Sequence, residues 1–398
     1  MPQGALTGLV GGAHPLVDGI ALSLERMTGV EEVDPVMATM TVLAGTPLEI
    51  VHREAEKSDL MFPVDLGARG SCTIGGMIAT NAGGNRVIRY GMTRESILGL
   101  EVVLANGEVV TTLNKLIKNN AGYDLKQLFI GSEGTLGIVT RAVLKLRARR
   151  ASSTAAIVGC RGFNELVEAF RLARSRLGDS LSSFEVMWPA FFDFMLSHVQ
   201  GASRPLDGSH NLYFLIEASE FEAGRDTERL EACLGELLEA GVVEDAIVAR
   251  SESESQGLWA IREGVSEYAK VAGGIASFDI GLPTNQIGNF VEQLSEALCG
   301  RWPSILSHFF GHVGDSNLHV VVGLAALNGG QDEEEMIAFV YDAVRGANGT
   351  ISAEHGIGVK KKPYLSYSRT PAELELMATI KRAVDPSNIL NAGRVISV

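Results

Sequence analysis

Two histidines seven residues apart, His312 and His319, are followed downstream by an adjacent glutamate and histidine, Glu354 and His355. Two imidazoles and one carboxylate are ligands that suit zinc or a similar divalent metal ion. The remaining imidazole, His355, could then move a proton. A metal ion with a spare base beside it indicates chemistry on a hydroxyl or carbonyl group. Each histidine alone fits a buried side chain that only makes hydrogen bonds, but the set of four favours a metal site.

The segments around these residues predict how the side chains are positioned. Turn-forming residues between 311 and 316 predict a loop, and residues 318–322 predict the strand that follows it. A loop histidine and a strand histidine can converge on one ion, whereas a single helix face does not explain this spacing. Glu354 is expected just after the end of another strand, at residues 350–352.

Apolar periodicity beyond about residue 150 predicts a separate domain. The expected elements are strands at 155–158, 211–217 and 246–248 and helices at 166–177, 230–238 and 336–344. Their β-α-β-β-α-β order resembles a ferredoxin-like antiparallel sheet with helices on one face. A capping box that begins at Thr370 opens a last helix, which is expected to end before Asp385 and Pro386.

The first 150 residues are rich in glycine, of which the chain has 45. Segments 67–84 and 131–138 interleave glycine with hydroxyl side chains, which lets backbone N–H groups converge on a phosphate or a polar ring edge. Neither segment matches the dinucleotide-binding or P-loop patterns, so tight turns of a β-rich domain remain the alternative. Strands are expected at 101–104 and 109–110, joined by an Asn-Gly turn, and at 138–146.

Composition and charge exclude several classes of protein. Hydrophobic residues make up 46% and charged residues 21% of the 398 residues, which is ordinary for a folded globular protein. The net charge of −14 argues against nucleic acid or an anionic membrane as the main partner. No apolar run predicts a transmembrane helix, and no secretory or Arg-rich leader is visible. The four cysteines lie far apart and predict reduced, mostly buried thiols.

Long ordered motifs give the chain a resemblance to a known family. They lie at 63–67, 74–84, 89–91, 122–125, 131–138 and 389–394. They resemble the FAD-binding domain of the vanillyl-alcohol oxidase and p-cresol methylhydroxylase (PCMH) superfamily. Within it the chain is most similar to D-2-hydroxyglutarate dehydrogenases, with D-lactate dehydrogenases and glycolate oxidase flavin subunits as near relatives.

The resemblance implies an α+β protein with three parts. Residues 1–150 would form a PCMH-type FAD-binding domain. Residues 151–365 would form the C-terminal domain of FAD-linked oxidases, a ferredoxin-like antiparallel-sheet cap over the substrate. Residues 366–398 would form a helix and tail that return to the FAD domain. Family members carry a further segment ahead of the first loop, so the FAD-binding domain is expected to be N-terminally incomplete.

The resemblance also assigns cofactors, FAD and Zn²⁺, and the residues that hold them. His312, His319 and Glu354 match the metal ligands of the family, and His355 matches its general base. Residues 2–8 match the loop that binds the diphosphate, although the family has Gly-Gly-Asn where this chain has Gly-Ala-Leu. The implied cofactor contacts are Gly4, Thr7, Gly8, Pro63, Cys72, Thr73, Gly75, Gly76, Thr80, Asn81, Gly83, Gly84, Glu133, Gly137, Ile138 and Asn391.

Four residues bear on the substrate. Arg262 can hold a carboxylate with two hydrogen bonds, and an ion pair with a neighbouring acid is the alternative. The resemblance makes Arg262 a substrate contact, together with Ser266, which stands where the family has threonine. The hydroxyglutarate enzymes have a lysine in place of Ser277 and an asparagine in place of Val321. The loss of that cation predicts a substrate that is smaller or less charged than 2-hydroxyglutarate.

The implied reaction is the oxidation of a D-2-hydroxy acid to its 2-oxo acid. Zinc would polarise the C2 hydroxyl group, His355 would take its proton, and the C2 hydride would pass to flavin N5. The implied partners are the small 2-hydroxy acid and an electron acceptor such as electron-transfer flavoprotein or a quinone, and a homodimer is left open. The bacterial cytoplasm and the mitochondrial matrix both fit.

Three other functions are weighed against this one. The first is a D-lactate dehydrogenase or a glycolate oxidase subunit, which would use the same chemistry. The second is a catalytically idle, truncated fragment, which the departures in the first loop and the early start favour and the intact metal set opposes. The third is a zinc hydrolase, which fits the metal set but leaves the glycine-rich half unexplained.

Overall fold

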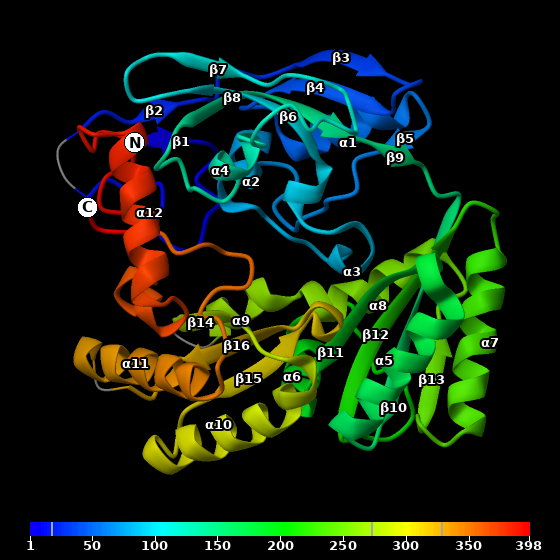
Figure 1. Ribbon diagram of the computed structural model, residues 1–398. Coiled ribbons are helices and arrows are strands. Elements are labelled where there is room, and N and C mark those ends of the chain that lie inside the picture. Colours follow the sequence, from blue (N-terminus) through cyan, green and yellow to red (C-terminus); the bar gives the residue numbers. More distant parts are fainter. Residues whose placement is uncertain (17–18, 272–273, 328) are drawn as a thin grey trace. The chain divides into compact units, whose positions relative to one another are not determined.

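The computed structural model describes residues 1–16, 19–271, 274–327 and 329–398 (Figure 1). The chain divides into two compact units. Unit 1 comprises Met1–Arg149 and Glu354–Val398, and unit 2 comprises Arg150–Ala353. The last helix and the tail therefore belong to the same unit as the glycine-rich half.

Unit 1 contains a five-stranded antiparallel sheet with two smaller ladders. In spatial order the sheet consists of β3 (Val30–Asp34), β4 (Thr39–Leu43), β8 (Ile138–Lys145), β6 (Ile97–Val103) and β7 (Val109–Thr111). The ladders pair β1 (Pro2–Gln3) with β2 (Leu22–Ser23) and β5 (Leu60–Met61) with β9 (Arg147–Ala148). The helices are α1 (Leu48–Glu56), α2 (Ile74–Thr80), α3 (Val87–Tyr90), α4 (Lys126–Phe129) and α12 (Pro371–Val384).

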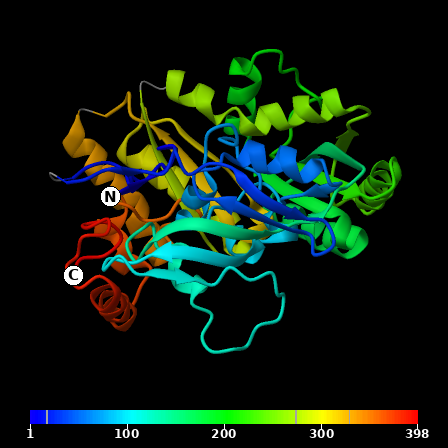
Figure 2. The same cartoon turned by 90° about the horizontal axis from the view of Figure 1, so that it is seen from above.

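The strands and the last helix of unit 1 confirm several sequence predictions. The hairpin of β6 and β7 pairs Val103 with Val109, and Gly107 in its turn takes a φ of +85°, which glycine adopts without a steric cost. Helix α12 has the predicted capping box, in which the Thr370 hydroxyl accepts from the backbone N–H of Glu373. Figure 2 shows the long connection after β7 projecting away from this sheet.

Helix α2 brings the first glycine-rich segment against the core of unit 1. Its apolar residues Ile74 and Ile78 are fully buried in a cluster with sheet residues such as Val42 and Leu100. Gly75 donates its backbone N–H to the carbonyl oxygen of Ala44 at 2.7 Å. A side chain at Gly75 would collide with Ala44, so glycine is required for this close approach of helix and strand. The opposite side of α2 is thereby left to face the pocket described below.

Unit 2 is built on a seven-stranded antiparallel sheet in the order β13-β10-β12-β11-β15-β16-β14. The strands are β10 (Ser152–Cys160), β11 (Leu181–Met187), β12 (Leu212–Glu220), β13 (Asp245–Val248), β14 (Ile275–Gly281), β15 (Ser307–Gly311) and β16 (Asn317–Gly323). The helices are α5 (Phe163–Leu177), α6 (Pro189–His198), α7 (Arg225–Glu239), α8 (Glu252–Glu263), α9 (Val265–Val271), α10 (Ile287–Arg301) and α11 (Gly330–Gly346).

The sheet of unit 2 consists of two ferredoxin-like halves that join along β11 and β15. In the first half the strands lie in the order β13-β10-β12-β11, which confirms the predicted ferredoxin-like sheet, although β11 itself was not predicted. The second half repeats this order with β14, β15 and β16. Its fourth strand, expected at residues 350–352, is reduced to a single bridge between Gly281 and Thr350. The strand stays short because the chain leaves unit 2 after Ala353.

Helices cover both faces of this sheet rather than the one face that the sequence suggested. Helices α5 and α7 contact one face, while α6, α8 and α9 form a buried cluster on the other with Tyr213, Leu215 and Phe310. Every residue of β11 is buried, and so is nearly all of β12. Strands that are buried on both faces need cover on both, and the continuous apolar run of β12 is the sequence signal for that arrangement.

Two further expectations concern the whole chain. No helix among the described residues is both long and apolar enough to span a lipid bilayer. All four cysteines are free, and three of them are buried. Burial raises the pKa of the Cys72 thiol to about 11 and that of Cys160 to about 12, so both thiols are protonated at neutral pH.

Candidate active site

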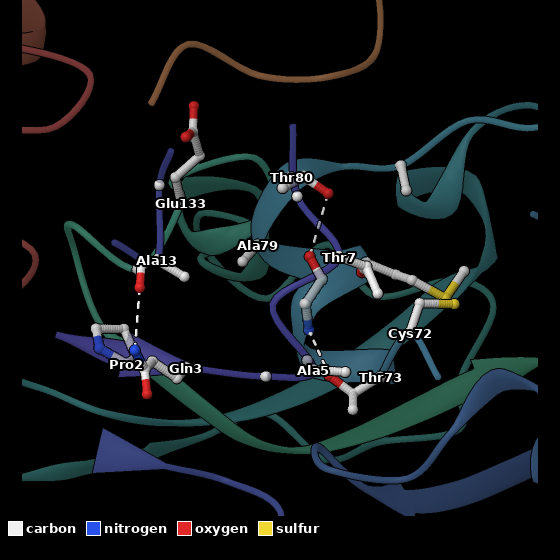
Figure 3. A pocket seen from close by; sticks show the side chains of 18 of the residues that line it. Pro2, Gln3, Ala5, Thr7, Ala13, Cys72, Thr73, Ala79, Thr80 and Glu133 are labelled. Carbon is white, nitrogen blue, oxygen red and sulfur yellow. Dashed lines mark hydrogen bonds between the residues drawn. The ribbon is translucent and has the colours of Figure 1, made fainter. Parts of the chain in front are cut away.

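Unit 1 contains a cavity of about 350 Å³ that opens beside α2 (Figure 3). This volume lies in the range of small-molecule and cofactor sites, about 300–1,000 Å³. Among the predicted cofactor contacts, its lining includes Gly4, Thr7, Gly8, Cys72, Thr73, Gly75, Gly76, Thr80, Gly83, Glu133, Gly137, Ile138 and Asn391. The lining comes from loops that are distant in sequence and are brought together by α2 and by the tail after α12.

Three predicted cofactor contacts, Pro63, Asn81 and Gly84, do not belong to the lining of this cavity. Asn81 instead ends α2 in a left-handed conformation, and its side-chain oxygen accepts from the backbone N–H of Arg94 at 2.9 Å. A side chain at Gly84 would collide with the carbonyl oxygen of Asp65. Both residues shape the loop that carries their neighbours.

The first loop approaches the cavity wall closely. A side chain at Gly4 would come within 2.6 Å of the Thr73 hydroxyl oxygen, so this position requires glycine. Leu6, two residues on, has a φ of +59° and a side chain that is 59% exposed. Left-handed backbone is strained for leucine and tolerated by glycine or asparagine. The substitution noted in the sequence therefore has a structural cost at the edge of the cavity.

Asn391 gives the cavity an unsatisfied hydrogen-bond acceptor that a cofactor could fill. Its side-chain nitrogen donates to the carbonyl oxygens of Glu133 and Gly12, at 2.7 and 3.2 Å. Its side-chain oxygen is buried and has no hydrogen-bond partner among the described residues. A cavity lined by glycine, hydroxyl groups and an unused acceptor suits a large cofactor that carries polar groups along its length. The residues present therefore fit FAD.

Glu133 joins the cavity wall to the loop that follows His355. Its carboxylate accepts from the backbone N–H groups of Ile357 and Gly358, at 2.7 and 2.8 Å. Burial raises the pKa of the Glu133 carboxyl group, and the two hydrogen bonds only partly offset this effect. A side chain at Gly356 would come within 2.8 Å of the carboxylate. Glu133 therefore holds the loop from His355 to Gly358 in place.

Glu354 and His355 both line the same cavity of unit 1. Their potential ligand atoms lie within 4.8 Å of one another. Gly83 makes room for the glutamate, because a side chain there would come within 2.5 Å of the Glu354 carboxylate. The predicted base and the predicted carboxylate ligand thus lie at the wall of the predicted cofactor cavity.

In unit 2 the structure brings the two histidines together. His312 precedes a short 3₁₀ turn after β15, and His319 lies in β16, as the sequence predicted. Their ring centroids are 5.2 Å apart, and both residues are buried. This distance allows one nitrogen from each ring to reach the same ion at about 2 Å.

A buried carboxylate orients His312. Glu185 in β11 is 1% exposed, and its Oε1 accepts from Nδ1 of His312 at 2.7 Å. Arg262 of α8 lies near Nε2 of the same ring, at 3.5 Å. Because arginine only donates, both contacts fit the tautomer that carries its proton on Nδ1 and its lone pair on Nε2. A carboxylate behind the imidazole is typical of metal-binding histidines.

Arg262 is ion-paired within unit 2. Its Nε and Nη2 both donate to Oε2 of Glu185, at 2.9 and 2.8 Å. Burial raises the pKa of the Glu185 carboxyl group, but the attraction of His312 and Arg262 outweighs it and leaves that pKa below its usual range. Arg262 also lies over the ring of Phe310. Nη1 is therefore the nitrogen through which Arg262 could contact a substrate.

Asp279 is a further candidate that the sequence analysis missed. In β14 it pairs directly with His319, and the potential ligand atoms of these two residues lie within 4.8 Å of one another. Its carboxylate accepts from Asn317 at 2.9 Å and from Ser352 at 3.3 Å. The sequence signal for Glu185 and Asp279 was the same, a single acid inside an otherwise apolar strand.

The other predicted substrate contacts lie in the same sheet or next to it. Ser277 is exposed and pairs with Val321, two residues along the strands from Asp279 and His319. Ser266 lies in α9, but its side chain is outside the described part of the chain.

Comparisons with known proteins place the chain in a family. A family model for the C-terminal domain of FAD linked oxidases matches residues 149–395, and one for an FAD binding domain matches residues 1–113. The chain belongs to the family of FAD-linked oxidases, and it is an FAD-dependent oxidoreductase. It is 38% identical over 400 residues to the mitochondrial D-2-hydroxyglutarate dehydrogenase of Arabidopsis thaliana, covering 100% of this chain and 70% of that protein.

Other relatives agree with this result. The chain is 40% identical over 395 residues to the mitochondrial D-2-hydroxyglutarate dehydrogenase of Bos taurus, covering 99% of this chain and 72% of that one. The chain is 36% identical over 403 residues to a D-2-hydroxyglutarate–pyruvate transhydrogenase of Saccharomyces cerevisiae, covering 100% of this chain and 81% of that protein. The structure of p-cresol methylhydroxylase with substrate bound superposes with a TM-score of 0.72 at 16% identity, over 95% and 80% of the two chains. The predicted PCMH-type fold is confirmed.

Proposed function

We propose that this protein oxidises a D-2-hydroxy acid to the 2-oxo acid, using FAD and a divalent metal ion, with zinc as our candidate. The relatives named above are dehydrogenases and a transhydrogenase of D-2-hydroxyglutarate. The single observation that carries the metal is the pair of buried histidines 5.2 Å apart with Glu185 bonded to one of them. A hydrolytic zinc site would not need the cavity of unit 1.

We assign His312, His319 and Glu354 as the residues that would hold the metal. The tautomer of His312 has its lone pair on Nε2, where a metal ion would replace the contact with Nη2 of Arg262 at 3.5 Å. His319 presents its ring on the same side of the sheet as Asp279. Bound there, a divalent cation would supply Lewis acidity that lowers the pKa of the C2 hydroxyl group. The assignment requires Glu354 of unit 1 to act together with the two histidines of unit 2.

We assign His355 as the base that removes the hydroxyl proton. It lines the cavity that we assign to FAD, and Glu133 holds the backbone that follows it. When bound, FAD supplies the acceptor for the hydride that leaves C2. The glycine-lined wall lets the cofactor approach the base closely. We propose electron-transfer flavoprotein or a quinone as the acceptor that reoxidises the flavin.

The substrate carboxylate would contact Nη1 of Arg262, because Nε and Nη2 already bind Glu185. Ser277 and Val321 supply no positive charge where a second carboxylate would lie. We therefore propose that the preferred substrate is smaller or less charged than 2-hydroxyglutarate. This choice follows from the residues of this chain and departs from the substrate named for its relatives.

Anaerobic mixing with a panel of acids tests the proposal. The protein, loaded with FAD, should lose its flavin absorbance on addition of a D-2-hydroxy acid and not of the L-isomer. The panel contains glycolate, D-lactate, D-malate and D-2-hydroxyglutarate. Dialysis against a chelator should abolish the bleaching, and Zn²⁺ should restore it if zinc is the metal.

Two histidine variants provide the matched comparison. His355→Gln should lower the rate of flavin reduction by about 100-fold or more, because general-base catalysis typically contributes 10²–10⁴-fold. His210→Gln is the control, since His210 lies in the same chain but contacts Glu244 at the far edge of unit 2. A chelated protein that still reduces its flavin would remove the metal from the proposal. A clear preference for D-2-hydroxyglutarate would overturn the substrate assignment.

A further inference from the structure

Two buried polar side chains of unit 2 have atoms that no described residue satisfies. Tyr268 on α9 is 1% exposed and His308 on β15 is 7% exposed. The hydroxyl oxygen of Tyr268 and Nδ1 of His308 have no hydrogen-bond partner within the described ranges. The two rings meet edge to face with centroids 4.7 Å apart. Unsatisfied buried polar atoms are rare in native proteins, so two of them on rings in contact make these rings a candidate binding site.

The register of the sheet locates this pair relative to the histidines. His308 lies opposite Val321, which lies opposite Ser277. Directly opposed residues share a face of an antiparallel sheet, as do residues two apart along a strand. The row of His308 is therefore the next row on the same face as His319, at a spacing of about 7 Å. A substituent of a molecule that reacts beside His319 would reach this row.

The surroundings of the pair are apolar and aromatic. Phe194 of α6 packs against both rings, with centroid distances of 4.7 Å to Tyr268 and 5.2 Å to His308. Burial lowers the pKa of His308 to about 4 and raises the pKa of Tyr268 to about 12. Both groups are therefore uncharged at neutral pH. The phenol hydroxyl group can donate and accept, and Nδ1 of the neutral imidazole can do either according to its tautomer, so the pair complements a hydroxyl group or an amide.

We propose that Tyr268 and His308 bind the side chain of the substrate, and that this side chain is uncharged and carries a hydroxyl or amide group. The inference rests on the proposed function and specifies its substrate class. Among the described residues, the ring contacts of Tyr268 and His308 are aromatic, so a carboxylate would enter there at a large desolvation cost. A purely aliphatic side chain would leave both polar atoms unpaired, which sites built for hydrogen bonding reject.

Two pairs of acids test the preference. D-Glycerate and D-lactate differ by one hydroxyl group, and D-2-hydroxyglutarate and its 5-amide differ by the charge at the distal end. For the FAD-loaded protein, kcat/KM should be at least about 10-fold higher for the preferred member of at least one pair. A 10-fold ratio corresponds to about 1.4 kcal/mol. The preferred members are D-glycerate in the first pair and the amide in the second. Equal values within both pairs would overturn the proposal.

The substitution Tyr268→Phe removes only the unsatisfied hydroxyl group. It should abolish the preference, because kcat/KM for the preferred acid falls toward the value for the acid paired with it. It should also raise the Tm of the substrate-free protein, because it removes a buried polar group without a partner. A residue with a purely structural role would lower the Tm instead. His308→Phe keeps the ring and should remove the preference in the same way.

Tyr213→Phe is the matched control in the same unit. The Tyr213 hydroxyl group is buried but satisfied, with contacts to Nη1 of Arg204 at 3.2 Å and to the backbone N–H of His210 at 2.9 Å. Its loss should lower the Tm and leave the preference unchanged. If Tyr268→Phe retains the full preference, Tyr268 does not bind the side chain.

Calorimetric binding of the same acids separates this inference from the reaction. If the wild-type protein reduces no flavin with any D-2-hydroxy acid, the proposed function fails. In that case, tighter binding of the hydroxyl- or amide-bearing acid that is lost in Tyr268→Phe would still support the binding role of Tyr268. Absence of any binding preference would overturn the binding role of Tyr268 and His308 whether or not the reaction occurs.

Discussion

Two buried glutamates, Glu133 in unit 1 and Glu185 in unit 2, have opposite pKa shifts for a physical reason. Both are less than 9% exposed, and burial raises the pKa of each. Glu133 is bonded by neutral backbone N–H groups, so the effect of burial dominates. Glu185 faces an arginine and a histidine, whose attraction dominates instead. The sign of the pKa shift of a buried glutamate thus depends on whether its hydrogen-bond donors are neutral or charged.

The difference shows how each region is built. Backbone, glycine and hydroxyl groups on loops form the cavity of unit 1. Its shape should therefore be disturbed most by substitutions that add volume or change φ. Paired charges on rigid strands form the sheet face of unit 2. Its stability should therefore be lowered most by substitutions that leave one buried charge unpaired. Substitutions of matched size should therefore have different effects in the two regions.

The largest expected effect comes from breaking the charged network of unit 2. Glu185→Gln leaves the guanidinium group of Arg262, which is 5% exposed, without its carboxylate. Removing one partner of a buried ion pair should lower the free energy of unfolding by about 3–5 kcal/mol. Urea denaturation measures this loss.

An exposed ion pair provides the control for that loss. Arg176 and Glu236 join α5 and α7, and both side chains are 53% exposed. Glu236→Gln should change the free energy of unfolding by less than about 1 kcal/mol. Equal losses in the two variants would mean that burial of the Glu185 pair has no energetic consequence.

The next effect concerns volume in unit 1. Gly83→Ala would place a methyl group 2.5 Å from the Glu354 carboxylate, which must then move. Moving a reacting group by about 1 Å lowers the rate by about 100-fold. Flavin content, measured by absorbance, should fall much less than turnover. Gly8→Ala is the control, because Gly8 lines the same cavity and a methyl group there meets no atom within 4 Å.

Much of the scaffold could be predicted from the sequence, because local patterns specify it. The periodicity of β10, α5, β12 and α7 and the capping box at Thr370 each depend on neighbouring residues. The second ferredoxin-like half was not recognised, because β14, α10 and β15 were not predicted and only its later elements were.

The histidine pair could be predicted from type and spacing, whereas the residues that orient it could not. Glu185 contacts His312 across 127 positions of sequence, through the pairing of β11 with β15. A single acid inside a strand marks Glu185 as unusual, but nothing local indicates which side chain it contacts. Tyr268 and His308 likewise meet only in the folded sheet, since they are brought together by α9 and β15. Register decides such contacts, and the sequence does not give register directly.

A smaller effect should come from relieving strain at the edge of the cavity. Leu6 has a φ of +59°, which asparagine tolerates better than leucine. Leu6→Asn should therefore raise the free energy of unfolding by about 1 kcal/mol and tighten FAD binding, as measured by denaturation and flavin titration. Leu9→Asn is the control, because Leu9 is equally exposed, at 58%, and has no positive φ. A gain at both positions would point to solubility rather than backbone strain.

The smallest effect is a difference in pH dependence within unit 1. Because the pKa of Glu133 is raised on folding, the folded state binds this proton more tightly than the unfolded state. Stability should therefore fall as pH rises from about 4.3, the ordinary glutamate value, through the raised value. Glu133→Gln cannot ionise, so the stability difference between wild type and variant should shrink from pH 4 to pH 7.

Asp385 should show the opposite sign and completes this test. Burial raises the pKa of Asp385, but the hydrogen bond from Lys381 and two backbone N–H groups outweigh it, and the net pKa is lowered. Its contribution is present above the ordinary aspartate pKa of about 3.9 and is lost as pH falls through the lowered value. The stability difference between wild type and Asp385→Asn should therefore grow from pH 3 to pH 7. If the stability difference changes with pH in the same direction for both variants, the charge of the hydrogen-bond donors does not determine the direction of the pKa shift.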